Sequence, residues 1–227
     1  MDNHYDRKLN QKKSEQILQG LVKQVESEPK NAQNYYNLGA MLIEVKSYEQ
    51  AEELFVKALG LFQDADDETK DTLTYGLGNV YYSSGKLEAA ISEFKKIKTK
   101  KLLKDTYLMI AQSYVTLGNN KQALAFALTA LNEDNQDTDT LRLVAESLLA
   151  LGNFDEAARY YDQVLEINPK DGKTAFDRGL VAMVLTEPFD DYFEKARELD
   201  PGYFKKQQEK LEGIEKLLNS QRQQDED

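Results

Sequence analysis

The sequence has no cysteine and only one histidine among its 227 residues. The absence of cysteine excludes disulfides, thiolate nucleophiles, Cys-ligated zinc and iron–sulfur clusters. The single histidine, His4, lies in a polar N-terminal stretch, where we expect it to be solvated and assign it no role. Since neither a thiol nor a second imidazole is present to pair as base and nucleophile, we predict a protein that is not an enzyme and that needs no cofactor or metal.

Long apolar runs are also missing. Residues 1–13 lack the apolar core of a signal peptide, and no run approaches the roughly 18 residues of a membrane span, so we expect a cytoplasmic protein without a membrane-spanning helix. The formal charge of −11 disfavours a broad role on nucleic acid, because like charges repel at long range. Gly76 and Gly78 form a G-x-G spacing, but we predict them inside a helix, where they serve packing rather than phosphate binding.

One pattern recurs four times along the chain. The stretches that begin at Tyr35, Tyr75, Tyr107 and Leu141 each contain a Gly or Ala that is followed twelve positions later by alanine, at Ala51, Ala90, Ala123 and Ala157. Successive copies are offset by 39, 33 and 34 residues. Such a period is typical of stacked helix-turn-helix units, and we predict an all-α, right-handed α-solenoid.

The repeat frame predicts the organisation of the whole chain. We expect a flexible segment 1–13, an opening helix 14–30, hairpins at about 32–62, 71–99, 104–134 and 138–169, a degenerate repeat 173–201, a capping helix 202–219 and a disordered tail 220–227. Glycine occupies the inner turn of three hairpins, while Lys46 occupies it in the first, which predicts either strain or a different turn there. Candidate N-caps are Asp71, Asp105, Asp137 and Asp171.

The recurring residues resemble the tetratricopeptide repeat signature. The resemblance rests on Leu77, Gly78, Tyr81, Gly85, Ala90 and Phe94 in the second copy, with matching sets in the first and fourth, and it covers about residues 14–201. Small residues let paired helices approach closely, and bulky ones such as Phe55 and Phe94 fill the gap to the next unit. The resemblance implies an adaptor or assembly factor that binds a partner peptide or helix.

In such arrays the first helices line a concave surface that can hold a peptide. By this frame the predicted partner-binding groove consists of Tyr36, Asn37, Tyr75, Asn79, Tyr82, Leu108, Gln112, Arg142, Glu146 and Phe176. An alternative is that the tyrosines are half-buried packing residues in a groove without a ligand. Repeat proteins that clamp acidic chaperone tails carry lysine, asparagine and arginine at set positions, where this chain has residues such as Tyr36, Ala40 and Asp105, so no chaperone tail is expected.

Two other functions stay open at this point. The array could be a self-associating structural scaffold module, although the degenerate repeat and capping helix would cover its C-terminal end and favour a monomer. It could also bind nucleic acid through Lys95 to Lys104, six lysines in ten residues. Because no aromatic residue lies in that run to stack on a base, we interpret it as a solvated turn between repeats.

Overall fold

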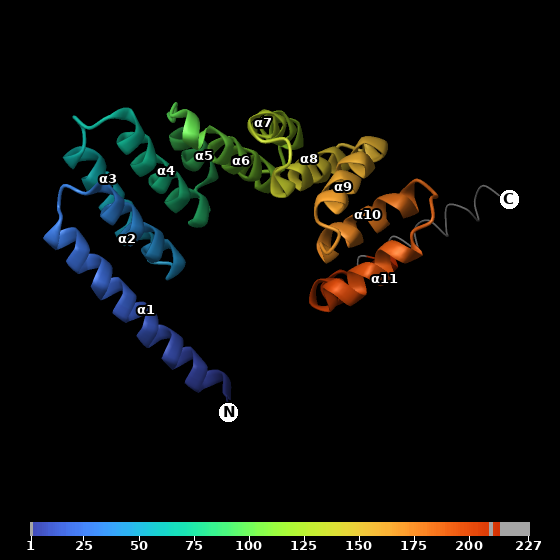
Figure 1. Ribbon diagram of the computed structural model, residues 1–227, viewed down its shortest axis with the longest axis horizontal. Coiled ribbons are helices and arrows are strands. Elements are labelled where there is room, and N and C mark those ends of the chain that lie inside the picture. Colours follow the sequence, from blue (N-terminus) through green and yellow to red (C-terminus); the bar gives the residue numbers. More distant parts are fainter. Residues whose placement is uncertain (1, 209–210, 214–227) are drawn as a thin grey trace. The chain divides into compact units, whose positions relative to one another are not determined.

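The protein is built from helices that follow one another in antiparallel pairs (Figure 1). The structure is a computed structural model that describes residues 2–208 and 211–213, and side chains from Lys13 onward. Residues 2–199 of this part contain α1 (Asp2–Ser27), α2 (Ala32–Glu44), α3 (Tyr48–Leu61), α4 (Asp67–Ser83), α5 (Leu87–Phe94), α6 (Lys100–Thr116), α7 (Asn120–Glu133), α8 (Thr138–Ala150), α9 (Phe154–Ile167), α10 (Gly172–Val184) and α11 (Asp190–Leu199). Residues 201–208 and 211–213 are helical as well. No strand occurs among these residues, and the predicted all-α class of helix-turn-helix hairpins is confirmed.

The helices form two compact units, residues 1–117 and residues 118–227. Unit 1 holds α1 to α6, and unit 2 holds α7 to α11 with the helical residues that follow. Helix α1 begins at Asp2, inside the segment 1–13 that we expected to be flexible. That segment contains no proline or glycine, and its three lysines, with Arg7, Leu9 and Gln11, favour helix even without an apolar face. The predicted tail 220–227 lies outside the described residues.

In unit 1 the ring of Phe55 fixes the spacing of three helices. Phe55 projects from α3 and is fully buried between α2 and α4. A Cβ atom added at Gly39 or at Gly76 would lie 2.3 Å from this ring. Both helices can therefore come this close to the ring only because the residue at the contact has no side chain. Phe94 occupies the same position one repeat later and abuts Gly78 at 2.5 Å by the same measure. Glycine is therefore required at these positions because the aromatic ring takes the space of a side chain.

The turns inside the hairpins use the left-handed backbone region. Gly85, Gly118 and Gly152 have φ values of +79°, +74° and +80°. Lys46 adopts φ +62° at the corresponding position of the first hairpin, so that turn keeps the common geometry and accepts the strain. Thr186 does the same at φ +59° in the fifth hairpin. The turn geometry thus persists where the sequence departs from glycine.

Two of the four predicted N-caps are wrong. Asp137 and Asp171 cap α8 and α10 as expected, each accepting a hydrogen bond from the backbone N–H three residues later. Asp71 and Asp105 lie inside α4 and α6, because these helices have 17 residues instead of the 13 of α2, α8 and α10. The extra turn of α4 begins at Asp67, four residues before Asp71, and Asp66 caps it.

The fifth hairpin replaces an apolar core residue with Arg178. Its side chain is buried, donates to Asp162 and Glu187 at 2.9 Å each, and stacks on the ring of Tyr192 at 5.0 Å. These contacts link α9, α10 and the shortened turn before α11. The charge is tolerated here because two carboxylates pair with it.

We predict that Gly76→Ala destabilises unit 1. The new methyl group would lie 2.3 Å from the Phe55 ring, and overpacking of a core costs about 1–3 kcal/mol, more than the gain of about 1 kcal/mol from replacing a helical glycine. Urea unfolding followed by circular dichroism measures the change.

The matched control is Gly20→Ala in α1, where an added Cβ meets nothing within 4 Å. This variant keeps the helix-propensity gain without the clash, so its midpoint should stay equal or rise. Equal stability of the two variants would contradict the packing role of Gly76.

Candidate functional site

In unit 1 the first helices α2, α4 and α6 present tyrosine hydroxyls beside a carboxylate. Tyr36 packs its ring edge-on against Phe55 at 6.2 Å, and Tyr75 packs against Phe94 at 5.5 Å. Both side chains are half-buried, so each tyrosine contributes to the core and keeps part of its surface open to solvent. Asp105 of α6 is close enough to influence both tyrosines. We call Tyr36, Tyr75, Asn79, Asp105 and Gln112 the first-helix face of unit 1.

The environment keeps both hydroxyls protonated. Burial raises the pKa of Tyr36, and the negative charge of Asp105 raises it further. Burial raises the pKa of Tyr75 strongly, with further contributions from Asp105 and Tyr36, while a hydrogen bond with Asn79 opposes the shift. A protonated phenol both donates and accepts, so each tyrosine offers a hydrogen-bonding end on a fixed ring.

The remaining predicted groove residues of unit 1 differ in how far they are exposed to solvent. Tyr82, Asn79, Leu108 and Gln112 are half-buried on α4 and α6. Asn37 is exposed, and its amide oxygen accepts a hydrogen bond from Gln33 at 2.9 Å on the same helix. The charge of Asp105 raises the pKa of both Tyr36 and Tyr75, and Asn37 is not among the groups that shift either pKa.

Asp71 fixes the start of α6 relative to α4. One oxygen of its carboxylate, Oδ2, accepts hydrogen bonds from the backbone N–H groups of Lys98 and Thr99 at 2.9 and 2.8 Å, and from the Thr99 hydroxyl at 2.7 Å. Partial burial alone would raise the pKa of Asp71, but these hydrogen bonds and the nearby Lys98 lower it below its ordinary value. The carboxylate predicted as an N-cap thus joins two helices that form the first-helix face.

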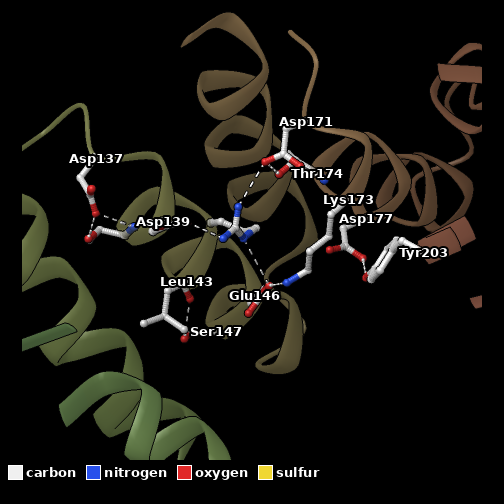
Figure 2. Close-up of polar contacts among 12 residues, drawn as sticks. Asp137, Asp139, Leu143, Glu146, Ser147, Asp171, Lys173, Thr174, Asp177 and Tyr203 are labelled. Atoms are coloured by element: carbon white, nitrogen blue, oxygen red, sulfur yellow. Dashed lines mark hydrogen bonds and ion pairs between the residues drawn. The ribbon is translucent and has the colours of Figure 1, made fainter. Parts of the chain in front are cut away.

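In unit 2 the corresponding face is charged. Arg142 of α8 donates to Asp139 at 2.6 Å and to Asp171 at 3.2 Å, and its Nε lies 4.0 Å from Glu146. Glu146 also accepts from Lys173 of α10 at 2.9 Å, and Figure 2 shows how Asp139, Glu146, Asp171 and Lys173 converge. Burial disfavours the charged form of Arg142, but the carboxylates outweigh it and raise the pKa of the guanidinium. The predicted groove residues Arg142 and Glu146 therefore share one ionic network.

Phe176 is not part of an open groove, and its prediction as a groove residue is wrong. Its side chain is 0% exposed and lies in the core of unit 2. The rings of Phe193, Tyr203 and Phe204 pack around it at 5.4, 5.7 and 5.6 Å. The helical residues 201–208, which overlap the segment 202–219 that we predicted as a capping helix, cover α10 at this point.

Three further polar residues of unit 2 were missed in the sequence. The Tyr203 hydroxyl donates to Asp177 at 3.3 Å. Tyr161 is fully buried, and burial raises the pKa of its hydroxyl, with further contributions from the negative charges of Asp177 and Glu146. A signal was present, because Tyr161 stands where other repeats have Phe55 or Phe94, and Asp177 stands where the second repeat has Gly76. Polar residues at buried positions that hold apolar residues or glycine in other repeats are uncommon, and their presence calls for an explanation.

The lysine run 95–104 forms the turn between α5 and α6 and the first turn of α6. Acidic side chains pair with several of these lysines: Lys96 with Glu93 at 2.7 Å, and Lys101 with Glu68 at 2.9 Å. Lys95 lies over the ring of Tyr114 at 5.7 Å. Much of the positive charge is thus balanced within unit 1.

Over residues 2–208 and 211–213, no helix is long and apolar enough to cross a bilayer. In the same residues, no group of three or more histidine and acidic side chains is arranged to hold a metal ion.

Stacked helical hairpins with small and aromatic residues at a repeat spacing define a helical-repeat protein. Sequence models described as Tetratricopeptide repeat match residues 31–99, 105–137 and 139–171. The chain belongs to the tetratricopeptide repeat family. Tetratricopeptide repeat protein 12 of Homo sapiens is 33% identical over 97 residues, which are 41% of this chain, and the match spans 13% of that relative.

Solved structures share the fold. pilF of Pseudomonas aeruginosa superposes with a TM-score of 0.70 at 18% identity, over 90% of this chain and 92% of that chain. YrrB, described as a TPR protein with an unusual peptide-binding site, gives a TM-score of 0.60 at 24% identity, over 80% of this chain and 93% of that chain. At these identities the likeness shows the fold alone, and that fold supports a role in binding a protein partner.

We predict that Asp71→Ala destabilises unit 1 by about 1–3 kcal/mol at pH 7, because it leaves two backbone N–H groups without their acceptor. The lowered pKa means that the carboxylate contributes fully above about pH 4, its unfolded value, and loses this contribution as the pH falls through the folded pKa. The stability difference between wild type and variant should therefore shrink in acid, as measured by urea unfolding from pH 7 to pH 2.

Glu53→Ala serves as the control, since this exposed side chain contacts only Lys57 on its own helix. We expect it to leave the unfolding midpoint at pH 7 unchanged. A constant difference between Asp71→Ala and wild type across the whole pH range would contradict the role assigned to the carboxylate.

Proposed function

We propose that this protein is a non-catalytic adaptor or assembly factor that binds a segment of a partner protein along the faces of its first helices. The fold supports this proposal, since tetratricopeptide repeats are protein-binding scaffolds. The observation that carries it furthest is the first-helix face of unit 1, where Tyr36 and Tyr75 hold hydroxyl groups on rings that are fixed by Phe55 and Phe94.

Fixed tyrosines are well suited to hold a peptide. A tyrosine offers a large contact area with few rotatable bonds, so little conformational entropy is lost on binding. The amides of Asn79 and Gln112 on neighbouring helices can each donate to and accept from a peptide backbone. Such a surface can bind an extended or helical segment by hydrogen bonds and ring contacts, without strict charge matching.

We expect the triple variant Tyr36→Phe, Tyr75→Phe and Asn79→Ala to lose partner capture by about tenfold or more. The two phenylalanines keep the rings on Phe55 and Phe94, so the core is preserved while three hydrogen-bonding groups are removed. The tagged full chain would be used to capture proteins from a lysate of its source cells, with quantitative mass spectrometry as the readout.

The control is Glu53→Ala with Lys57→Ala, which removes an exposed ion pair from α3, a second helix of its hairpin. It should capture the same proteins as wild type. Both variants are checked by circular dichroism for an unchanged unfolding midpoint. If the folded triple variant captures the wild-type set of proteins in equal amounts, the first-helix face of unit 1 is not the binding surface.

A further inference from the structure

The turn between α5 and α6, together with the first residues of α6, presents lysines to solvent. Lys96, Lys98, Lys100 and Lys101 are all exposed, and we call these four residues the lysine turn. They are close in sequence, and consecutive Cα atoms are about 3.8 Å apart, so their ammonium groups can reach one bound segment. The protein has a formal charge of −11, so this local concentration of positive charge is unusual within it.

The backbone of the lysine turn is held in place by α4 and by the core. The Oδ2 atom of Asp71 accepts hydrogen bonds from the backbone N–H groups of Lys98 and Thr99 at 2.9 and 2.8 Å. The side chain of Ile97, between the lysines, is only 5% exposed and anchors the turn in the core. A partner therefore meets a turn that does not have to be ordered on binding.

Acidic side chains of unit 1 neutralise the lysine turn only in part. Lys96 pairs with Glu93 and Lys101 with Glu68, but the two lysine side chains are 60% and 77% exposed. Ion pairs that are this exposed contribute little to stability, so an external carboxylate can replace Glu93 or Glu68 at small cost. Among the residues whose side chains are described, none forms an ion pair with Lys98 or Lys100.

The first turn of α6 has the opposite charge from the one that favours the start of a helix. Helix N-termini carry partial positive charge, so acidic side chains are stabilising there and lysines are destabilising. The first turns of α4, α8, α9 and α11 contain acidic residues, whereas that of α6 contains Lys100 and Lys101 and no acidic residue. Thr99 does not cap α6 with its side chain, since its hydroxyl donates to Asp71 instead. A carboxylate bound beside these lysines would offset their unfavourable effect.

We propose that the lysine turn binds an acidic segment of a partner protein. Carboxylates of this segment pair with Lys98 and Lys100, which lack an ion pair among the described residues, and compete for Lys96 and Lys101. The lysine turn is separate from the first-helix face of unit 1. The inference therefore goes beyond the proposed function and does not depend on it.

Other polyanions fit the lysine turn less well than an acidic protein segment does. Residues 96–101 contain no aromatic ring to stack on a base and no arginine to bind a phosphate through two parallel hydrogen bonds. A membrane surface would require an apolar side chain that enters the bilayer, and Ile97 is buried. Carboxylates on a flexible chain need only the ammonium groups that the lysine turn provides.

Fluorescence anisotropy with a labelled oligoglutamate peptide, titrated with the full-length protein, tests the inference. Wild type should bind the peptide. The variant with Lys98→Gln, Lys100→Gln and Lys101→Gln should bind at least about tenfold more weakly, because three charge pairs with the peptide are removed. Its unfolding midpoint in circular dichroism should stay equal or rise, since lysines are removed from the positive end of α6.

The charge-matched control carries Lys23→Gln, Lys170→Gln and Lys195→Gln, three exposed lysines on other parts of the chain. Both triple variants have the same net charge, so a difference between them depends on where the lysines lie and not on how many there are. The control should bind oligoglutamate like wild type. If wild type does not bind the peptide, or if the two variants bind it equally well, the inference is overturned.

Two further measurements fix the class of partner and separate this inference from the proposed function. Mixed-sequence RNA and phosphatidylcholine vesicles that contain phosphatidylserine should bind wild type more weakly than oligoglutamate does. Tighter binding of either one, lost in the lysine-turn variant, would overturn the assignment of a protein partner. The variant with Tyr36→Phe, Tyr75→Phe and Asn79→Ala should bind oligoglutamate like wild type, so that each proposal can fail without the other.

Discussion

The contact between an aromatic ring and a bare α-carbon is the constraint on which the packing of unit 1 depends, and it recurs between α10 and α11 in unit 2. Phe55 is buried between Gly39 of α2 and Gly76 of α4, so one side chain of a second helix sets the distance between two first helices. Phe94 and Phe193 repeat the contact at Gly78 and Gly179. Because the ring replaces a side chain at the glycine, the separation of the helices follows from local geometry rather than from a central core.

The same contact determines what the first helices can present. With Phe55 and Phe94 fixed, Tyr36 and Tyr75 pack on these rings as half-buried side chains. In unit 2 the corresponding positions hold Arg142 on α8 and the polar pair Tyr161 and Asp177, so the face becomes ionic. One packing scheme therefore supports a tyrosine and amide face in unit 1 and an ionic face in unit 2.

The sequence predicted the hairpin fold well because the repeat spacing reports on contacts between neighbouring helices. Features that depend on single hydrogen bonds were harder to predict. Asp71 looks like an N-cap, yet α4 begins four residues before it, at Asp67. Its carboxylate accepts hydrogen bonds from the turn before α6 instead. Phe176 fits the groove pattern, but Tyr203 and Phe204 pack on it, and the predicted capping helix gave no indication of which of its side chains reach α10.

Site-specific photocrosslinking tests most directly the claim that partners bind the first helices. A benzoylphenylalanine residue at position 82 on α4 places the reactive group on a first helix, and the same residue at position 56, an exposed valine of α3, places it on a second helix. In a lysate of the source cells we expect crosslinked partner bands from position 82 and none from position 56. Crosslinks from position 56 alone would contradict the account.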